Sequence, residues 1–250
     1  MAVQTFDSDG VEIAFRDEGE GEPILLIHGF ASNHVINWVG PSWFDTLKGA
    51  GYRVIALDNR GHGSSEKLYD PVLYPSRTMA QDARRLLDHL TIAQARVMGY
   101  SMGARISAFL CMDAPERVSK VVFGGLGINM VRGIGGAEKI AQALRSDKLS
   151  DVEDQGAKAF RVFAEQTKSD REALATCILA SRDPITEDDV RGITHKALVA
   201  VGTKDVVSGD GLTLVDLLPN GTFLDITGRD HMTAVGDKIF KAGVLDFFAS

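Results

Sequence analysis

The clearest pattern along the chain is a series of short apolar runs, each followed by a polar or glycine-rich turn. Near the start, the alternating segments 3–6 and 11–16 flank the polar turn 7–10, which predicts an antiparallel hairpin. The later runs are continuously apolar, as strands buried on both faces of a parallel sheet are. They span residues 24–27, 52–57, 95–100, 118–123, 197–201 and 222–226.

Segments with apolar residues at helical spacing lie between or after several of these runs. Segment 78–90 places Met79, Ala83 and Leu87 on one helical face, segment 104–112 predicts a buried helix, and 239–248 predicts a final amphipathic helix. Strands that alternate with helices indicate a parallel sheet covered on both faces. The pattern therefore predicts an α/β fold.

The alternation stops after residue 127. Up to residue 193 the chain shows only helical patterns, at 137–145, 152–166, 171–181 and 187–191. We therefore expect residues 1–127 and 194–250 to form the core domain. Residues 128–193 are expected to form a helical cap inserted after the sixth strand.

Composition narrows the class of protein. The 250 residues, of which 44% are hydrophobic, can fill a sizeable core, and the net charge of −7 comes without a basic cluster that would favour nucleic acid or an anionic membrane. No apolar stretch approaches the roughly 18 residues of a membrane span, and the N-terminal residues lack a signal-peptide pattern, so the expected location is cytoplasmic. Cys111 and Cys177 lie in apolar helical segments and are expected to be buried free thiols.

Candidate chemistry centres on Gly99-Tyr100-Ser101-Met102-Gly103, where an apolar run meets a helical segment. A strand that turns sharply into a helix strains the backbone of the serine and leaves no room for side chains at the flanking glycines. The pentapeptide alone is equally compatible with an ordinary tight turn. Its position between a strand and a helix favours a nucleophile elbow.

Two further polar residues follow later strands. Asp205 comes after 197–201 and His231 comes after 222–226, and the carboxyl ends of parallel strands meet at one edge of the sheet. Ser101 would attack an acyl carbon, His231 would take its proton, and Asp205 would orient the imidazole. The backbone N–H groups of Phe30 and Met102 are expected to stabilise the oxyanion.

Asp230 is a second candidate for the acid, because it directly precedes His231. A neighbouring side chain does not easily reach the imidazole Nδ1 of the next residue. Residues 124–127, after the sixth strand, hold no carboxylate. Both points favour Asp205.

Taken together, the motifs at 28–30, 58–65, 99–103, 202–205 and 228–231 resemble those of α/β-hydrolase-fold serine hydrolases of the capped esterase and lipase-like group. The resemblance covers essentially the whole chain. It implies an eight-stranded, mostly parallel sheet with an antiparallel second strand, a cap after the sixth strand, and acyl transfer without a metal ion or organic cofactor. Within this fold, dehalogenases and epoxide hydrolases attack through aspartate and dienelactone hydrolases through cysteine, so a serine favours cleavage of carboxylic esters or lactones.

The expected partner is a small-molecule ester with an apolar acyl group, bound by a monomer or homodimer. The residues expected near the acyl pocket are His28, Gly29, Phe30, Trp38, Trp43, Met102, Ile128 and Met130. The side chains of the loop residues His28, Asp58 and His62 are expected to make structural hydrogen bonds rather than to take part directly in catalysis. The histidines at 34, 89 and 195 are expected to lie at the surface or to be satisfied by hydrogen bonds.

Three other functions use the same motifs. A perhydrolase would pass the acyl group to peroxide, and a carbon–carbon bond hydrolase would need a cap arginine for a substrate carboxylate, with Arg132, Arg161 and Arg182 available. A charge on a helix is more often simply solvated. A small-ligand receptor with slow turnover is the third, because fold and triad do not by themselves prove an efficient enzyme.

Overall fold

The computed structural model describes residues 3–250, so Met1 and Ala2 of the expected core domain lie outside the described residues. Eight strands form one sheet in the order β1-β2-β4-β3-β5-β6-β7-β8. Their bounds are β1 Gln4–Asp7, β2 Glu12–Glu18, β3 Glu22–Ile27, β4 Tyr52–Leu57, β5 Ala95–Tyr100, β6 Val118–Gly124, β7 Lys196–Gly202 and β8 Gly221–Ile226.

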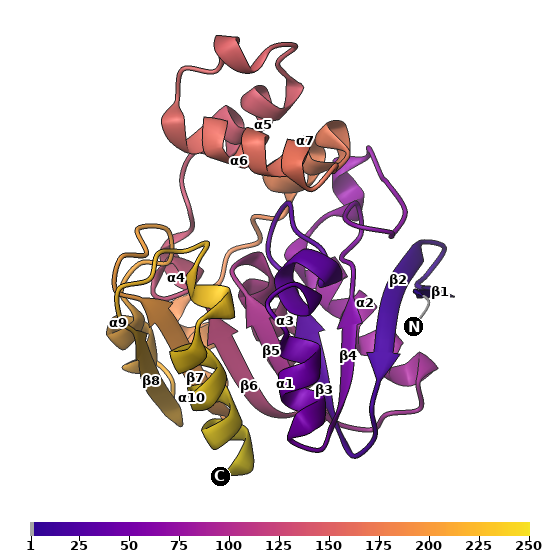
Figure 1. Ribbon diagram of the computed structural model, residues 1–250, viewed down its shortest axis with the longest axis vertical. Coiled ribbons are helices and arrows are strands. Elements are labelled where there is room, and N and C mark those ends of the chain that lie inside the picture. Colours follow the sequence, from indigo (N-terminus) through magenta and orange to yellow (C-terminus); the bar gives the residue numbers. More distant parts are fainter. Residues whose placement is uncertain (1–2) are drawn as a thin grey trace.

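Strand β2 pairs antiparallel with both β1 and β4, whereas the pairs from β4 through β8 are parallel. This topology confirms the expected eight-stranded, mostly parallel sheet with its second strand reversed. It also brings the carboxyl ends of β3, β5, β7 and β8 to one edge of the sheet, which is the upper edge in Figure 1.

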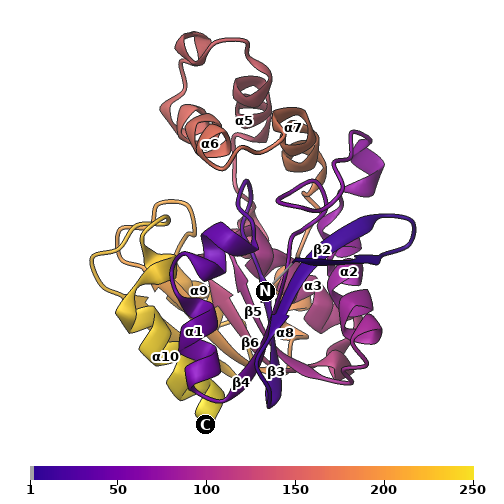
Figure 2. The same ribbon diagram turned by 45° about the vertical axis from the view of Figure 1, so that its right-hand side comes forward.

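Alternate residues of each central strand face opposite layers of helices, as the two-residue period of a strand requires. On one face, Ile24 and Leu26 pack with α1 (Trp43–Gly49) and α10 (Lys238–Ala249). On the other face, Leu25 and Ile27 pack with α2 (Ser76–His89) and α3 (Met102–Asp113). Figure 2 shows α1 and α10 together on one side of the sheet and α2 with α3 on the other. Both faces of the central strands are thereby covered.

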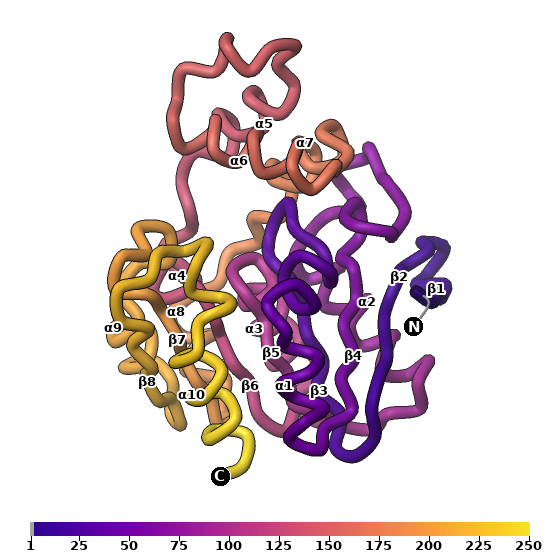
Figure 3. Tube along the Cα trace, viewed as in Figure 1, coloured from indigo at the N-terminus to yellow at the C-terminus, as the bar shows by residue number. Residues whose placement is uncertain are grey.

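The chain between β6 and β7 is helical. It contains α4 (Asn129–Arg132), α5 (Ala137–Arg145), the turn η4 (Leu149–Asp151), α6 (Gln155–Gln166), α7 (Arg171–Ala180) and α8 (Glu187–Arg191). Helices α5, α6 and α7 stand above the carboxyl edge of the sheet, and the tube in Figure 3 shows the chain rising to them and returning. Their apolar residues belong to the same buried cluster as α2 and α3.

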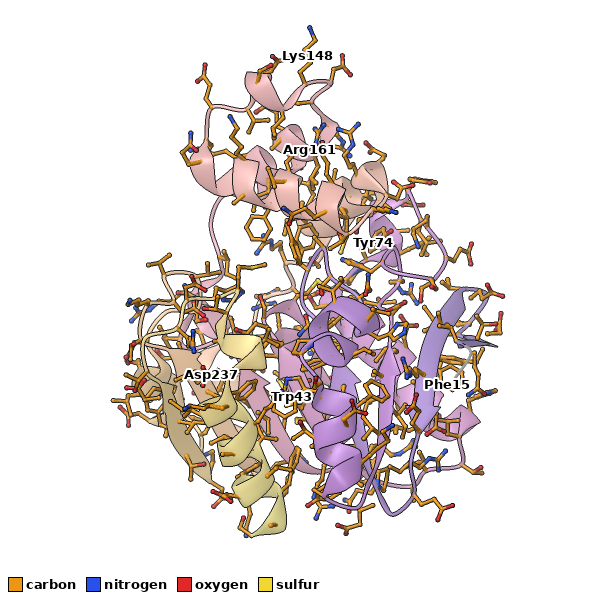
Figure 4. The ribbon with its side chains drawn as sticks, in the orientation of Figure 1. Phe15, Trp43, Tyr74, Lys148, Arg161 and Asp237 are labelled. Atoms are coloured by element: carbon orange, nitrogen blue, oxygen red, sulfur yellow. The ribbon has the colours of Figure 1, made fainter. Side chains whose placement is uncertain are left out.

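Buried Arg161 holds these upper helices together. Its Nη1 donates to the carbonyl oxygens of Ala143 (2.8 Å) and Ser146 (2.7 Å) at the end of α5, and its Nε donates to Glu165 (2.7 Å). The last carbonyls of a helix have no partners within it, so a cation there satisfies them. Figure 4 shows Arg161 inside this helical group, with Lys148 at its outer end.

The helical segment is also tied to the core from below. Tyr69 Oη donates to the Asp170 carboxylate (2.8 Å), Thr167 Oγ1 donates to Ala31 O (3.1 Å), and Ser76 N–H donates to Asp183 (2.5 Å). Tyr69 and Ser76 flank η2 (Pro71–Leu73), on the α2 side of the molecule. These bonds fix the height of the upper helices above the sheet.

Several elements have no counterpart in the sequence pattern. The chain after β3 forms a π-helix, η1 (Val35–Val39), followed directly by α1, and a short helix α9 (Gly211–Val215) precedes β8. The 3-10 turns η3 (Pro115–Arg117) and η5 (Ala234–Gly236) complete the chain. In η1 and α1 the apolar residues Trp38 and Trp43 are fixed by tertiary packing. The Trp43 ring, labelled in Figure 4, packs against Phe240 of α10 at 5.2 Å between ring centroids.

The two cysteines are buried and free, as expected from their apolar segments. Burial raises the pKa of the Cys177 thiol to about 12. Among residues 3–250, no helix is long and apolar enough to cross a membrane.

The buried pair Arg60 and Asp82 gives a test of the fold. Asp82 accepts Arg60 Nε and Nη2, both at 2.7 Å, and also Ser8 Oγ at 2.6 Å. Removing the carboxylate would leave a buried guanidinium without its counter-charge. We expect Asp82→Ala to lower the free energy of unfolding by about 3–5 kcal/mol in urea titrations.

The matched control is Asp188→Ala, which removes an exposed carboxylate paired with Arg191. Because exposed pairs contribute little, its unfolding midpoint should stay close to that of the wild type. Equal midpoints for the two variants would contradict the importance of the buried pair.

Candidate active site

Ser101 lies at the turn between β5 and α3. Its backbone has φ 56° and ψ −115°, a region that a residue with a side chain rarely adopts. Its N–H donates to Gly124 O of β6 (2.8 Å), which fixes the turn to the sheet. A Cβ on Gly99 would collide with the carbonyl of Gly103, and a Cβ on Gly103 would collide with that of Ile27. The two glycines are therefore required by the close approach of strand and helix.

The structure brings Ser101, His231 and Asp205 together. Ser101 Oγ lies 3.0 Å from His231 Nε2, and His231 Nδ1 lies 2.8 Å from Asp205 Oδ2. The serine follows β5, the aspartate follows β7 and the histidine follows β8. This chain of hydrogen bonds can pass a proton from the hydroxyl to the imidazole and stabilise the imidazolium that forms.

The environment of Asp205 keeps its carboxylate charged. Burial by itself would raise the pKa of Asp205, but hydrogen bonds from His231, Ser208 and the Val207 N–H outweigh it, so the pKa is lowered. The Asp205 side chain is fully buried, whereas the His231 side chain is 13% exposed. The carboxylate is thus held out of water while the imidazole remains accessible to a ligand.

Asp230, the second candidate for the acid, has other partners. Its Oδ1 accepts the N–H groups of Met232 (3.1 Å) and Thr233 (2.9 Å) and the Thr233 hydroxyl (2.6 Å). These bonds shape the loop that carries His231. No hydrogen bond joins Asp230 to the imidazole within the part of the chain that the structure describes.

Tyr100 supports the histidine from below. Its hydroxyl donates to His231 O (2.7 Å), and the two rings lie 5.6 Å apart. Burial raises the pKa of the Tyr100 phenol, so the hydroxyl stays a donor at neutral pH. Tyr100, the residue before Ser101, therefore positions His231, whose Nε2 lies 3.0 Å from Ser101 Oγ.

Two backbone N–H groups beside Ser101 are free to receive a negative charge. Met102 is the first residue of α3, whose N–H has no acceptor within the helix. The N–H of Phe30 takes part in no hydrogen bond among residues 3–250. The loop after β3 passes close to the serine, because a Cβ on Gly29 would lie 3.3 Å from Ser101 Cβ. An oxyanion held there would also benefit from the helix dipole.

A buried polar network fixes that loop. Asp58 accepts the His34 N–H (2.7 Å), His34 Nδ1 (2.9 Å) and the Ser64 N–H (2.8 Å). Burial alone would raise the pKa of Asp58, but His34, His28 and the Ser64 N–H lower it to about 2. His28 Nε2 accepts the Asn59 N–H (2.9 Å), and its Nδ1 bonds to Gly29 O (2.7 Å). These hydrogen bonds hold the loop after β3 against the loop after β4.

The remaining histidines are each packed or bonded. His34 is buried against Asp58, the His89 ring stacks on Phe6 at 5.3 Å, and His195 Nε2 bonds to Pro115 O (2.9 Å). The surroundings of these three rings agree with the expectation that they are surface or satisfied residues.

Two cavities meet at Ser101. A cleft of about 850 Å³ lies between the upper helices and the core and is bordered by His231. A small cavity of about 60 Å³ lies on the other side of the serine, beside Met102. Phe30, Phe160 and Val207 border both cavities. Ser101 is therefore open to two spaces of different size.

Only part of the expected acyl pocket is found at these cavities. Gly29 and Phe30 border the large cleft, and Met102 borders the small cavity. The other expected residues are buried and border neither of these two cavities, because they pack within the core or the loop network: His28, Trp38, Trp43, Ile128 and Met130.

Sequence reasoning missed other residues at the cavities. Phe160 and Phe163 of α6 border the cleft, and Phe160 contacts Phe30 at 5.8 Å between rings. Asn37 also borders it, and its Oδ1 accepts the Gly29 N–H (3.2 Å). The phenylalanines lie one helical turn apart on α6, a spacing that could have marked one face of that helix but not what it faces.

Within residues 3–250, no group of three His, Cys, Asp or Glu side chains is arranged to hold a metal ion.

Comparison with known proteins defines the family. The model of the alpha/beta hydrolase fold family matches residues 22–205, so the chain belongs to the α/β hydrolase family. A Mycobacterium tuberculosis protein with the provisional name non-heme bromoperoxidase BpoC is 29% identical over 96% of this chain and 98% of its own length.

Solved structures show the same fold. A hydrolase from Pseudomonas aeruginosa superposes with a TM-score of 0.83 at 22% identity, covering 99% of this chain and 98% of its own. An esterase from Exiguobacterium antarcticum superposes with a TM-score of 0.80 at 20% identity, covering 97% of each chain. At these identities the likeness concerns the fold alone.

Acid should destabilise the loop network through His62. Burial, reinforced by repulsion from His28, lowers the pKa of His62 to about 3, whereas an unfolded histidine titrates near pH 6.5. Below about pH 6.5 the unfolded chain therefore binds a proton that the folded chain does not, so stability is lost as pH falls toward 3. We expect His62→Asn to reduce the loss of unfolding free energy between pH 6.5 and 4.5 by about 2 kcal/mol.

Asparagine is chosen because its amide can replace the donor that bonds to Arg60 O (2.9 Å). Urea titrations of both proteins at the two pH values give the comparison. The stabilisation that comes from the lowered pKa of Asp58 is present above about pH 4 in both proteins, so it does not change between the two pH values. Parallel losses in the two proteins would contradict a neutral, buried His62.

Proposed function

We propose that the protein hydrolyses carboxylic esters or lactones through Ser101, His231 and Asp205. The observation that carries this proposal is the continuous hydrogen-bonded chain from the Ser101 hydroxyl to the buried Asp205 carboxylate. Membership of the α/β hydrolase family supports it, and the free N–H groups of Phe30 and Met102 supply the place for an oxyanion.

In the proposed reaction, Ser101 Oγ bonds to the carbonyl carbon while its proton passes to His231 Nε2. The carbonyl oxygen becomes an anion and accepts hydrogen bonds from the N–H groups of Phe30 and Met102. The carbon–oxygen bond to the alcohol then breaks, and the alcohol leaves with the proton from His231. Water, deprotonated by His231, attacks the acyl-serine in the same way and releases the carboxylic acid.

We also propose that the core comprises residues 1–127 and 194–250, and that residues 128–193 act as a cap that shapes the substrate site. Phe160 and Phe163 support this role, because they belong to α6 and border the cleft next to Ser101. The apolar cleft supports a substrate with a sizeable apolar group.

The first test is hydrolysis of p-nitrophenyl esters from acetate to decanoate by the wild type and Ser101→Ala. We expect serine-dependent turnover with a chain-length optimum, and a fall in kcat of at least about a thousandfold in the variant. Circular dichroism and the unfolding midpoint check that the variant is folded. Activity near that of the wild type in Ser101→Ala would end the assignment of the nucleophile.

The pH dependence tests the base. A protonated imidazole cannot accept the serine proton, so kcat/KM should fall as the pH is lowered from 8 to 5. The lowered pKa of Asp205 keeps its carboxylate ionised over this range, so a single ionisation should govern the fall. Asp205→Asn should lower kcat by about 10⁴-fold. A flat profile would count against His231 as the base.

A perhydrolase is the second candidate, favoured by the name of the Mycobacterium tuberculosis relative. Hydrogen peroxide in place of water would release a peracid from the acyl-serine, and a peracid oxidises bromide. Bromination of a dye by enzyme, acetate, peroxide and bromide, lost when acetate is omitted or Ser101 is replaced by alanine, would support this activity. Absence of bromination would exclude the perhydrolase activity.

A further inference from the structure

The small cavity beside Ser101 contains two arginine side chains. Arg105 comes from the first turns of α3, and Arg182 follows α7 in the return of the chain to the core. The rest of the lining is largely apolar and includes Leu126, Ile134 and Ile178. Two guanidinium groups thus face a confined apolar space next to the proposed nucleophile.

Neither arginine has a carboxylate partner. Arg105 donates Nη1 to Met130 O (2.6 Å) and Nη2 to Asp183 O, while its Nε is buried without an acceptor. Arg182 donates Nε to Ile178 O (3.1 Å), and its Nη2 is buried without an acceptor. Within residues 3–250, neither arginine forms an ion pair with an acidic side chain, although Asp183 near Arg105 and Glu138 near Arg182 favour the charged guanidinium.

Arg105 and Arg182 are half-buried, and the fully buried arginines differ from them in this respect. Arg60 is paired with Asp82, and Arg161 is paired with Glu165. A buried donor without an acceptor is costly, so the unpaired Arg105 Nε and Arg182 Nη2 beside one cavity point to a ligand that accepts hydrogen bonds there. Burial lowers the pKa of both Arg105 and Arg182, and for Arg105 repulsion by Arg182 adds to this lowering.

The position of the cavity indicates which part of a substrate would enter it. His231 borders the large cleft but not the small cavity, and the leaving alcohol must receive its proton from His231. The alcohol therefore departs on the side of the large cleft. The small cavity also borders Ser101 and is the space that remains for the acyl part.

We propose that Arg182, supported by Arg105, binds a carboxylate on the acyl part of the substrate, so that the preferred substrates are half-esters or lactones of dicarboxylic acids. The planar guanidinium of Arg182 has free donors in a fork that matches the two oxygens of a carboxylate. Arg105 is held by two backbone carbonyls and contributes mainly its charge. This inference rests on the proposed esterase activity and adds the substrate class.

The test compares monobenzyl esters of succinate, glutarate and adipate with benzyl butanoate, pentanoate and hexanoate, which match them in chain length. Benzyl alcohol release gives kcat/KM for each ester. We expect the wild type to favour the best half-ester by roughly ten- to a hundredfold, as a charge-assisted hydrogen bond provides. Arg182→Gln should abolish this preference, and Arg182→Lys should retain part of it.

Arg132→Gln is the matched control, because Arg132 is exposed, lies in the same inserted segment and borders neither cavity. It removes the same charge and should leave the preference for half-esters as in the wild type. An equal loss of preference in Arg132→Gln and Arg182→Gln would overturn the proposal, because the effect would then be one of net charge. Equal kcat/KM for half-esters and neutral esters in the wild type would also overturn it.

Binding without turnover separates this inference from the proposed function. Isothermal titration of glutarate and adipate into Ser101→Ala, and into Ser101→Ala with Arg182→Gln, measures the carboxylate site directly. If the dicarboxylates bind only when Arg182 is present and the wild type hydrolyses none of the esters, the anion site stands and the esterase assignment is overturned. Hydrolysis of neutral esters with no Arg182-dependent binding would overturn the anion site alone.

Discussion

The strained turn at Ser101 is the constraint on which the site depends. A positive φ at this residue lets β5 reverse directly into α3, and the reversal leaves no space for a Cβ at Gly99 or Gly103. The turn places the hydroxyl above the carboxyl edge of the sheet and the free N–H groups of the α3 N-terminus beside it. The loops after β3, β7 and β8 reach the same edge because the strands are parallel.

Hydrogen-bonded loops lie on one side of this turn, and open cavities lie on the other. Below it, Tyr100, Asp58 and His28 hold the neighbouring loops through buried hydrogen bonds. Above it, the helices between β6 and β7 leave one large apolar cleft and one small cavity that contains two unpaired arginines. Such an arrangement holds Ser101, His231 and Asp205 in place, and under the proposed function the upper helices would select the substrates that reach them.

Much of the fold could be predicted from the order of residues. The apolar runs 24–27, 52–57 and 197–201 correspond to β3, β4 and β7, and the helical patterns after residue 128 correspond to α5, α6 and α7. The meeting of Ser101, Asp205 and His231 could be expected because each follows a parallel strand. The π-helix η1 could not be expected, since its conformation depends on the packing around Trp38 rather than on a local repeat.

Local chemistry and periodicity therefore define the sheet, the elbow and the residues at strand ends, because these depend on near neighbours and on the common direction of the strands. The lining of the cavities depends on contacts between distant segments. Trp38 and Met130 are apolar like Phe160, yet the first two are buried in packed layers and only Phe160 borders the cavities at Ser101. In the same way, two arginines of the inserted segment differ in their surroundings: Arg161 is fully buried and paired with Glu165, whereas Arg182 is half-buried and borders the small cavity beside Ser101.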